Sequence, residues 1–443
     1  MNTQVHLNST KISILSIPKD KYWIFSSAVL QLLHLEAQKT NHNYETDSET
    51  ESSDESSSSD DGLSDESQQY NYSANNHTTN TSNGETISSP IDNSSKKIHS
   101  IDQVVVSESD EDDYNGITES SDEEEDNYFF HIAFTPEECT LMCASSIMQT
   151  LFHDPLELCK KLGYDLVQLL DEEFITLQVD SSDGYDNSSK VLQLTKPLST
   201  NKIPLFFLST HFGDIVLIPQ SSKERVVEIL TSKNFEFSNL SNSYINVNEK
   251  RSSKDTAASA SPNLDIEQRA FELFNRANVK PIINKSIKLL LTGSRSGEVS
   301  RTLLKTAQNL ASTDIQSVLF PQYFAVTRTS LNEVSLLLPK SSKTRAKMGF
   351  PSKYIIGSTQ DSIIPVTIDL NALPLDSTGI VAGLASRLLS GNKRVSSLPL
   401  EMSYLSMAKS GIIMIPKENI ALISAILKED DHLSQPIESL QLE

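Results

Sequence analysis

The chain has 443 residues, 37% of them hydrophobic, and a formal net charge of −22. The acidic excess is local: residues 41–126 hold 24 Asp and Glu against two Lys, and the acids and bases of the remainder balance. A neutral body without a basic stripe excludes nucleic acid as the main partner. The sequence has no signal-peptide pattern and no apolar run of membrane-spanning length, so we expect a cytoplasmic protein without membrane insertion.

The first part of the chain predicts one folded unit that is interrupted by a long insert. Residues 11–17 alternate apolar and polar side chains, which predicts a strand, and residues 22–35 indicate an apolar helix. Residues 39–126 are rich in Ser, Asn, Asp and Glu and poor in aliphatic side chains, so this acidic insert should be disordered. Two strand-like runs then follow, at residues 128–134 and 140–144.

The second part centres on a predicted hairpin at residues 201–219. Two short apolar runs flank the connection His-Phe-Gly-Asp, a pattern typical of two paired strands. A strand at residues 174–179 and a helix at 190–198 precede the hairpin, and a helix at 224–229 follows it. The predicted order is therefore strand, helix, strand, strand, helix.

The same order recurs in the C-terminal half of the chain. Residues 402–416 again give a strand, a four-residue connection and a strand that ends in Ile-Pro. A strand at residues 363–370 and a helix at 380–389 precede this hairpin, and a helix at 418–427 follows it. Repetition of a unit of this size is a strong indication of fold. The sequence therefore predicts an α+β protein built from βαββαβ, ferredoxin-like units.

We expect four such domains in tandem. The predicted boundaries are residues 10–38 with 127–165 for the split first domain, 39–126 for the disordered acidic insert, 166–238 for the second domain, 239–265 for a linker, 266–357 for the third domain with a preceding helix, 358–430 for the fourth, and 431–443 for a tail.

Residues that could carry chemistry are few. The thiols of Cys139 and Cys143 are four positions apart, but no second ligand pair follows, so buried thiols are expected rather than a zinc site. No nucleophile pattern accompanies His131, His153 or His211. We therefore expect no enzyme, no metal and no cofactor.

Two glycine-containing turns could receive an anion. The turn at residues 293–297 precedes a helix but lacks the Lys of a nucleotide-binding loop, so a plain strand-to-helix turn is the preferred interpretation. The turn at residues 378–382 also opens a helix. Its N–H groups could bind a carboxylate or could simply begin the helix, and chemistry alone does not decide between them.

The acidic insert carries serines followed closely by Asp or Glu, the pattern of acidophilic kinase acceptors. The predicted phosphorylation sites are Ser107, Ser109, Ser120 and Ser121. A plain solvated spacer is the alternative interpretation of the insert.

Four stretches together resemble a known family. They are KISILSIPKDKYWIF (11–25), TPEECTLM (135–142), LSTHFGDIVLIP (208–219) and TGIVAGLA (378–385). With them the chain resembles the CASTOR group of cytosolic arginine sensors, proteins of four tandem ACT domains. The resemblance covers most of the predicted ordered chain, is weak in the third domain, and has no counterpart to the acidic insert.

The resemblance implies a sensor without catalysis, with an amino acid bound between the second and fourth domains. The matching positions are Pro204, Leu205, Ser377, Gly379, Ile380, Met407, Ala408 and Gly411. The carboxylates that bind the guanidinium in the family fall on Ser377 and Gly411, neither of which is acidic. A buried guanidinium without a carboxylate partner is costly. We therefore expect a smaller or apolar amino acid, or no ligand, rather than arginine.

The resemblance also implies a partner. The family uses the hairpin connection of the second domain to hold a subunit of the GATOR complex, upstream of the target-of-rapamycin kinase. The matching positions are His211, Phe212 and Asp214, of which only the Asp is kept in type. Phe212 could anchor a partner or fold back onto its own domain. We expect the connection to face outward and the protein to be a homodimer.

Three functions stay open from the sequence. The first is a non-enzymatic, amino-acid-binding regulatory protein that controls a signalling partner, a GATOR-like complex in the target-of-rapamycin pathway. The second is a regulatory subunit of an enzyme of amino-acid metabolism. The third is an ACT scaffold that has lost its ligand and acts through the acidic insert.

Overall fold

Within the described residues, four successive segments of the chain repeat the order strand, helix, strand, strand, helix. In the computed structural model of the chain, these residues are 3–50, 128–180, 187–238, 262–311, 321–374, 376–395 and 399–428. All of them belong to one of the chain's two compact units, the one that comprises Met1–Thr50 and Glu125–Glu443.

The first two segments occupy the N-terminal half. The first consists of β1 (Thr3–Pro18), the 3-10 helix η1 (Lys19–Ile24), α1 (Ser26–Thr50), β2 (Phe130–Phe134), β3 (Glu138–Ala144), α2 (Ser145–Lys161) and β4 (Gln168–Leu169). The second consists of β5 (Phe174–Asp180), α3 (Asn187–Thr200), β6 (Phe206–Ser209), β7 (Gly213–Pro219), η2 (Gln220–Ser222), α4 (Lys223–Thr231) and β8 (Phe235–Phe237).

The other two segments follow α5 (Pro262–Arg276) and the short strand β9 (Pro281–Ile283). The third consists of β10 (Leu289–Ser294), α6 (Val299–Leu310), β11 (Phe324–Arg328), β12 (Val334–Pro339), α7 (Ser342–Lys347) and β13 (Ile355–Ile356). The fourth consists of β14 (Ile363–Asp369), α8 (Ile380–Val395), β15 (Ser403–Ser406), β16 (Ser410–Pro416), η3 (Lys417–Asn419) and α9 (Ile420–Lys428).

Several elements are longer than the sequence pattern predicts. β1 begins at Thr3 rather than at residue 11, and its pairing register with β5 shifts between Asn8 and Ile12. Polar residues at this irregularity interrupt the alternation of apolar and polar side chains, so the pattern does not predict the N-terminal half of the strand. α1 continues to Thr50, beyond the predicted start of the insert at residue 39. α5 begins at Pro262, inside the predicted linker.

Strand pairing joins the four segments into one closed ring. The order is β10, β12, β11, β2, β3, β1, β5, β7, β6, β15, β16 and β14, and β14 pairs back to β10 at Ile363 and Leu289. The junction between β6 and β15 is equally short, a single residue pair of Leu208 with Leu405. The sequence predicts separate antiparallel sandwiches. The structure instead pairs the edge strands of neighbouring segments, which removes exposed edges from the described strands of the ring.

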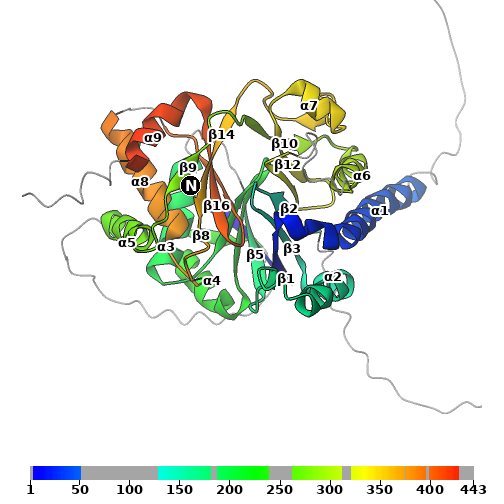
Figure 1. The fold of residues 1–443 in the computed structure, drawn as a ribbon, viewed down its shortest axis with the longest axis horizontal. Helices are drawn as coiled ribbons and strands as arrows, with labels where there is room; N and C mark the ends of the chain where they lie inside the picture. Colours follow the sequence, from blue (N-terminus) through cyan, green and yellow to red (C-terminus); the bar gives the residue numbers. More distant parts are fainter. Residues whose placement is uncertain are drawn as a thin grey trace, which may run out of the picture. The chain divides into compact units, whose positions relative to one another are not determined.

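Alternating side chains divide the core into an inner and two outer layers. In β7, Ile215 and Leu217 belong to the apolar cluster on one face, and Val216 and Ile218 belong to a helix-covered cluster on the other. Helices α3, α4, α5, α8 and α9 contribute to one outer cluster, and α1, α2 and α6 contribute to the other. Figure 1 shows these two groups of helices on opposite sides of the strands.

The two halves of the described chain repeat each other in their long-range pairing. The N-terminal half of β1 lies beside β5, and β9, which precedes β10, lies in the corresponding place beside β14. The hairpin connections repeat too: the His211 N–H donates to Ser335 Oγ at 2.9 Å, and the Ala408 N–H donates to Thr140 Oγ1 at 2.9 Å. Each connection therefore crosses to a segment in the other half.

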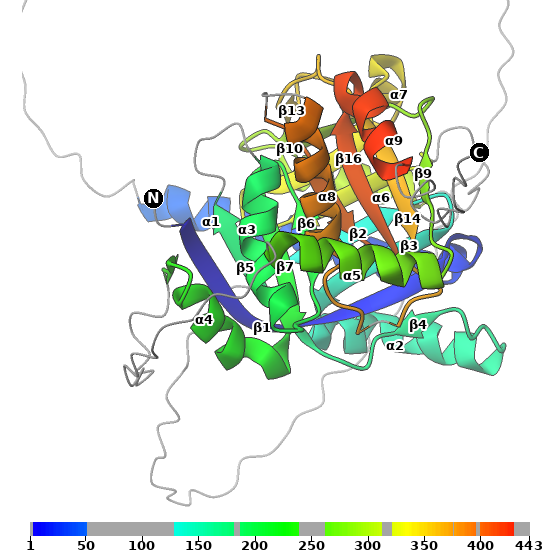
Figure 2. The same ribbon diagram turned by 90° about the vertical axis from the view of Figure 1, so that its left-hand side faces the viewer.

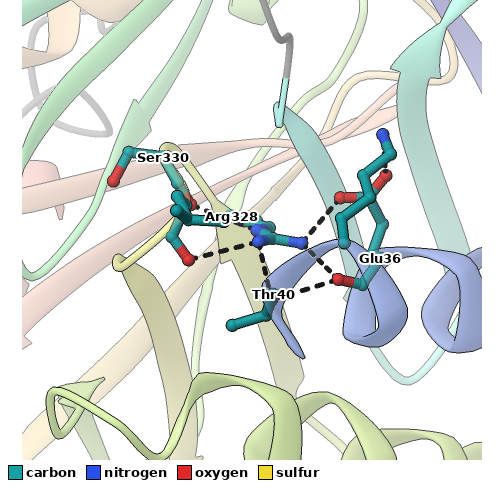
Figure 3. A network of polar contacts seen from close by, with 6 residues as sticks. Glu36, Thr40, Arg328 and Ser330 are labelled. Carbon is teal, nitrogen blue, oxygen red and sulfur yellow. Dashed lines mark hydrogen bonds and ion pairs between the residues drawn. The ribbon is translucent and has the colours of Figure 1, made fainter. Parts of the chain in front are cut away.

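A buried ion pair ties the first segment to the third (Figure 3). The guanidinium of Arg328, on β11, is fully buried and donates to Glu36 Oε2 at 2.8 Å and to Thr40 Oγ1 at 2.9 Å, both on α1. It also donates to the backbone carbonyls of Ser330 and Leu331. Nearly all of its donors are paired, which offsets the cost of removing the charge from water.

Several predictions fall outside the described residues. These are most of the acidic insert, its four candidate phosphorylation sites (Ser107, Ser109, Ser120 and Ser121), most of the linker and the C-terminal tail. In the described part of the chain, no helix combines the length and the apolar character that a membrane span requires.

Candidate functional site

A cavity of about 260 Å³ lies where the second and fourth segments meet. Its walls come from the end of α3, the residues that lead into β6, the connection from β14 to α8, and the hairpin of β15 and β16. Figure 2 shows α3 and α8 next to each other, with α5 across them. Of the eight predicted ligand positions, seven line this cavity: Pro204, Leu205, Ser377, Gly379, Ile380, Met407 and Ala408.

The start of α8 forms one wall of the cavity. Gly379 has a φ of +86°, and a Cβ there would lie 2.8 Å from Ser199 Oγ, so both backbone and space require glycine. The helical hydrogen bonds begin with the Gly383 N–H, which donates to the Gly379 carbonyl. The N–H groups of residues 380–382 therefore have no partner within the helix, and these residues line the cavity. Such a helix start favours a carboxylate.

Tyr404 takes the place that the eighth predicted residue was expected to fill. Gly411 does not line the cavity, and a Cβ on it would collide with the hydroxyl of Tyr404. Tyr404 is 1% exposed, lines the cavity, and its hydroxyl has no hydrogen-bond partner among the described residues. Burial raises the pKa of Tyr404, so its hydroxyl stays protonated at neutral pH.

Two other buried polar groups of the cavity wall are already paired. Ser406 Oγ accepts from the Phe207 N–H at 2.8 Å, across the junction of β15 with β6. Thr195 Oγ1 donates to the Val191 carbonyl at 2.7 Å within α3. These two side chains therefore hold the wall in place, and less of their hydrogen-bonding capacity is available to a ligand.

The hairpin connection of the fourth segment is held from behind by the first segment. Glu138, a buried residue at the start of β3, accepts from Ser410 Oγ at 2.6 Å and from the Lys409 N–H at 3.3 Å. Burial raises the pKa of this carboxyl. Sequence inspection did not single out Glu138 or Tyr404, because their roles depend on contacts between distant segments.

Charged side chains of the cavity lie only at its mouth. Among the described residues that line it, the ionisable carboxylates are Asp171, Glu172 and Asp376, all exposed, and none is Lys, Arg or His. Asp376 belongs to the same connection as Gly379, next to Ser377. The mouth is thus acidic while the buried part is uncharged.

The predicted partner-binding connection does not face outward. His211 and Phe212 are half-buried, and their rings lie against Gly293, with His211 also against Gly357. The His211 N–H is bound to Ser335. The expectation of an exposed loop is corrected, because the ring of strands brings this connection onto the third segment. Partner binding through His211, Phe212 and Asp214 stays a prediction.

Burial also shifts the pKa values of this connection. It lowers the pKa of His211 and raises that of Asp214 to about 6. A hydrogen bond from Ser209 and the charge of Lys190 oppose the shift of Asp214. Both shifts follow from the partial burial of this connection.

Within the described ranges, the cysteines and histidines are not gathered into one site. Cys139, Cys143 and Cys159 are buried free thiols, and burial raises the pKa of each. His131 is fully buried and bonded to Thr327 Oγ1 at 2.8 Å. Across the described ranges, no cluster of three or more His, Cys, Asp or Glu side chains is placed to hold a metal ion.

Two of the solved structures that match this chain are distant in sequence. The protein Atu0741 from Agobacterium tumefaciens matches 25% of this chain and 84% of its own, at 16% identity and a TM-score of 0.19. An aspartate kinase from Synechocystis matches 71% of this chain and 51% of its own, at 8% identity and a TM-score of 0.28. The chain thus spans about half of that kinase.

The comparison by sequence is more specific. No curated protein matches the chain. The family model of the ACT domain matches residues 169–232, which include α3, β6 and β7 and therefore one wall of the cavity. The second segment of this chain is an ACT domain.

Proposed function

We propose that this protein is a non-enzymatic regulator that binds one free amino acid in the cavity between its second and fourth segments. The observation that carries the proposal is the meeting of an ACT domain with the unpaired first turn of α8 around one small cavity. The presence of an ACT domain favours a regulatory protein that binds an amino acid. The cavity volume, about 260 Å³, suits a single small molecule.

The two charges of an amino acid have suitable counterparts at this site. The N–H groups of residues 380–382 suit the α-carboxylate. The carboxylate of Asp376 precedes them in the same connection and suits the α-ammonium group. The apolar side chains of Leu205, Phe206 and Met407 line the remaining wall.

The repeated order of elements supports four ACT-like domains in place of one. Each segment contains two helices and a group of antiparallel strands in the same order as the second. In this proposal the chain is a distant relative of the CASTOR-type sensors with a different ligand, because positions 377 and 411 carry Ser and Gly. Arginine is therefore not the proposed ligand.

The proposed mechanism is a population shift. A ligand bound at the junction of the second and fourth segments favours their closed pairing. The strands of this junction pair only at Leu208 with Leu405, so we propose that the ligand shifts the equilibrium between its open and closed forms. The readout is a cytoplasmic signalling partner, for which a GATOR-like complex upstream of the target-of-rapamycin kinase is our proposal, with the protein acting as a homodimer.

A thermal-shift screen of the twenty amino acids tests the proposal. The full chain should gain roughly 3–5 °C in Tm from at least one of them at about one hundred times its Kd. Gly379→Ala should abolish this gain, because its Cβ would meet Ser199 beside the unpaired N–H groups.

Gly163→Ala is the matched control. Gly163 has a φ of +69°, so alanine adds comparable backbone strain, but no atom lies within 4 Å of the added Cβ. This variant should keep the ligand-induced gain. No response to any amino acid would instead favour a ligand-free scaffold that acts through the acidic insert.

A further inference from the structure

We infer that Tyr404 sets the specificity of the cavity and selects an amino acid whose side chain is uncharged and can form a hydrogen bond. The inference rests on the proposed function, because it assigns a ligand class to the same cavity. Its basis is the placement of one buried hydroxyl.

Tyr404 as a whole is buried in the cavity wall, and its hydroxyl has no hydrogen-bond partner among the described residues. Buried hydroxyl groups are nearly always hydrogen-bonded, because an unpaired one loses its interactions with water and gains none. A ligand atom that accepts from this hydroxyl, or donates to it, would restore the missing bond.

Three buried hydroxyls of the cavity wall are committed elsewhere. Thr195 and Ser406 are bonded to backbone groups, and Ser410 donates to Glu138. The remaining buried hydroxyl, that of Ser199, lies against Gly379 at the start of α8 and is placed for the carboxylate end of a ligand. Tyr404 is thus left for the side chain.

Gly411 makes this arrangement possible. Any side chain on residue 411 would collide with the Tyr404 hydroxyl, so an acid at this position and the tyrosine exclude each other. The space that an acidic side chain at position 411 would fill is therefore occupied by the Tyr404 hydroxyl, a neutral group that can donate or accept a hydrogen bond.

The charges around the cavity support an uncharged side chain. Asp171, Glu172 and Asp376 are exposed at the mouth, and the phenol of Tyr404 stays neutral at physiological pH. A guanidinium, ammonium or second carboxylate placed beside Tyr404 would lose its hydration without gaining a counter-ion. An aliphatic side chain would leave the hydroxyl unpaired.

Two near-isosteric pairs of amino acids test the inference by calorimetric titration: L-threonine against L-valine, and L-glutamine against L-methionine. The full chain should bind the polar member of at least one pair at least about tenfold more tightly. Tyr404→Phe, which removes only the hydroxyl, should reduce that ratio to about one.

Tyr22→Phe is the matched control. Tyr22 is 1% exposed, and its hydroxyl donates to the Leu310 carbonyl at 3.2 Å, away from the cavity. This variant should keep the tenfold ratio of the unmodified chain.

The outcomes separate this inference from the proposed function. Tight binding of an amino acid whose selectivity is unchanged by Tyr404→Phe, or a preference for lysine, aspartate or glutamate, overturns the inference and leaves the proposed function standing. A preference for arginine overturns the inference and also the exclusion of arginine from the proposed function, while amino-acid binding itself stands. If folded, unmodified protein binds none of the twenty amino acids, both are overturned.

Discussion

At the scale of single residues, several polar groups are buried where segments meet. His131 lies on β2 opposite Thr327 of β11, at the junction of the first and third segments. Its Nε2 atom has no partner in the described part of the chain, and burial lowers the pKa of His131 to about 3. The imidazole is therefore neutral in the folded chain at mildly acidic pH, whereas in the unfolded chain, exposed to water, it is protonated at the same pH.

This shift predicts a loss of stability on acidification. Because the pKa is about 3 in the fold and 6.5 ordinarily, only the unfolded chain binds the proton between these values. As the pH drops below 6.5, the free energy of unfolding should therefore decrease. At pH 5 the decrease from this residue alone should be about 2 kcal/mol.

His131→Gln keeps a hydrogen-bonding group toward Thr327 but does not titrate. Chemical denaturation at pH 7 and pH 5 should show a smaller loss for this variant than for the unmodified chain. Asp214, whose pKa is raised to about 6, contributes the opposite slope in both proteins and cancels in the comparison. Equal losses would contradict the assignment.

The Arg328–Glu36 pair gives a second prediction at this scale. Arg328→Met removes the buried cation beside Glu36, whose carboxylate then keeps only the half-exposed Lys39 at 2.8 Å, so the free energy of unfolding should fall by about 3 kcal/mol, the lower end of the range for a broken buried pair. The double variant Arg328→Met with Glu36→Leu removes both charges and should recover a large part of that loss. Denaturant unfolding measures both; a double variant as unstable as the single one would refute the buried-charge explanation.

Among the elements, the hairpin connections have the least expected placement. The hairpin of β6 and β7 lies where the sequence predicts it, because two apolar runs and a turn are a local pattern. Its packing against Gly293 and Ser335 is not local, and no pattern within residues 201–219 indicates it. Tyr404 is not predicted from the sequence for the same reason. The resemblance points to its neighbour Gly411, but the closeness of the Tyr404 hydroxyl to residue 411 depends on the register of β15 with β16.

The packing of this connection predicts a coupling between two distant residues. A Cβ on Gly293 would lie 2.6 Å from Phe212 Cζ and 2.7 Å from His211 Cδ2. Gly293→Ala should therefore lower the free energy of unfolding by about 1–3 kcal/mol.

A double-mutant cycle tests whether this loss arises from contact with the ring of Phe212. Combined with Phe212→Ala, the substitution at Gly293 should cost at least about 1 kcal/mol less than it does alone. Gly163→Ala combined with Phe212→Ala should be additive, because Gly163 has no neighbour within 4 Å of an added Cβ. Additivity in the Gly293 cycle would show that the connection does not pack as described.

At the scale of the whole molecule, the ring of strands determines where the cavity lies. The sequence supports the α+β class and the repeated order of elements, since both follow from local patterning. Ring closure rests on junctions as short as Leu289 with Ile363, and on a half-strand before Ile12 that pairs with β5. Such contacts join residues far apart in the chain, so they leave no local pattern that could predict them.

The ring also explains why the predicted ligand residues converge. Pro204 and Leu205 precede β6, and Met407 and Ala408 follow β15, so the pairing of these two strands brings both groups to one cavity. These four residues, each of which the resemblance gives as a ligand position, therefore form one wall of the cavity, opposite the start of α8.

A crystal structure of the full chain grown with the amino acid that raises its Tm most would test this account most directly. We expect density for one molecule between the start of α8 and Tyr404, with the α-carboxylate at the N–H groups of residues 380–382. Density for that amino acid at another place on the protein, with this cavity empty, would contradict it.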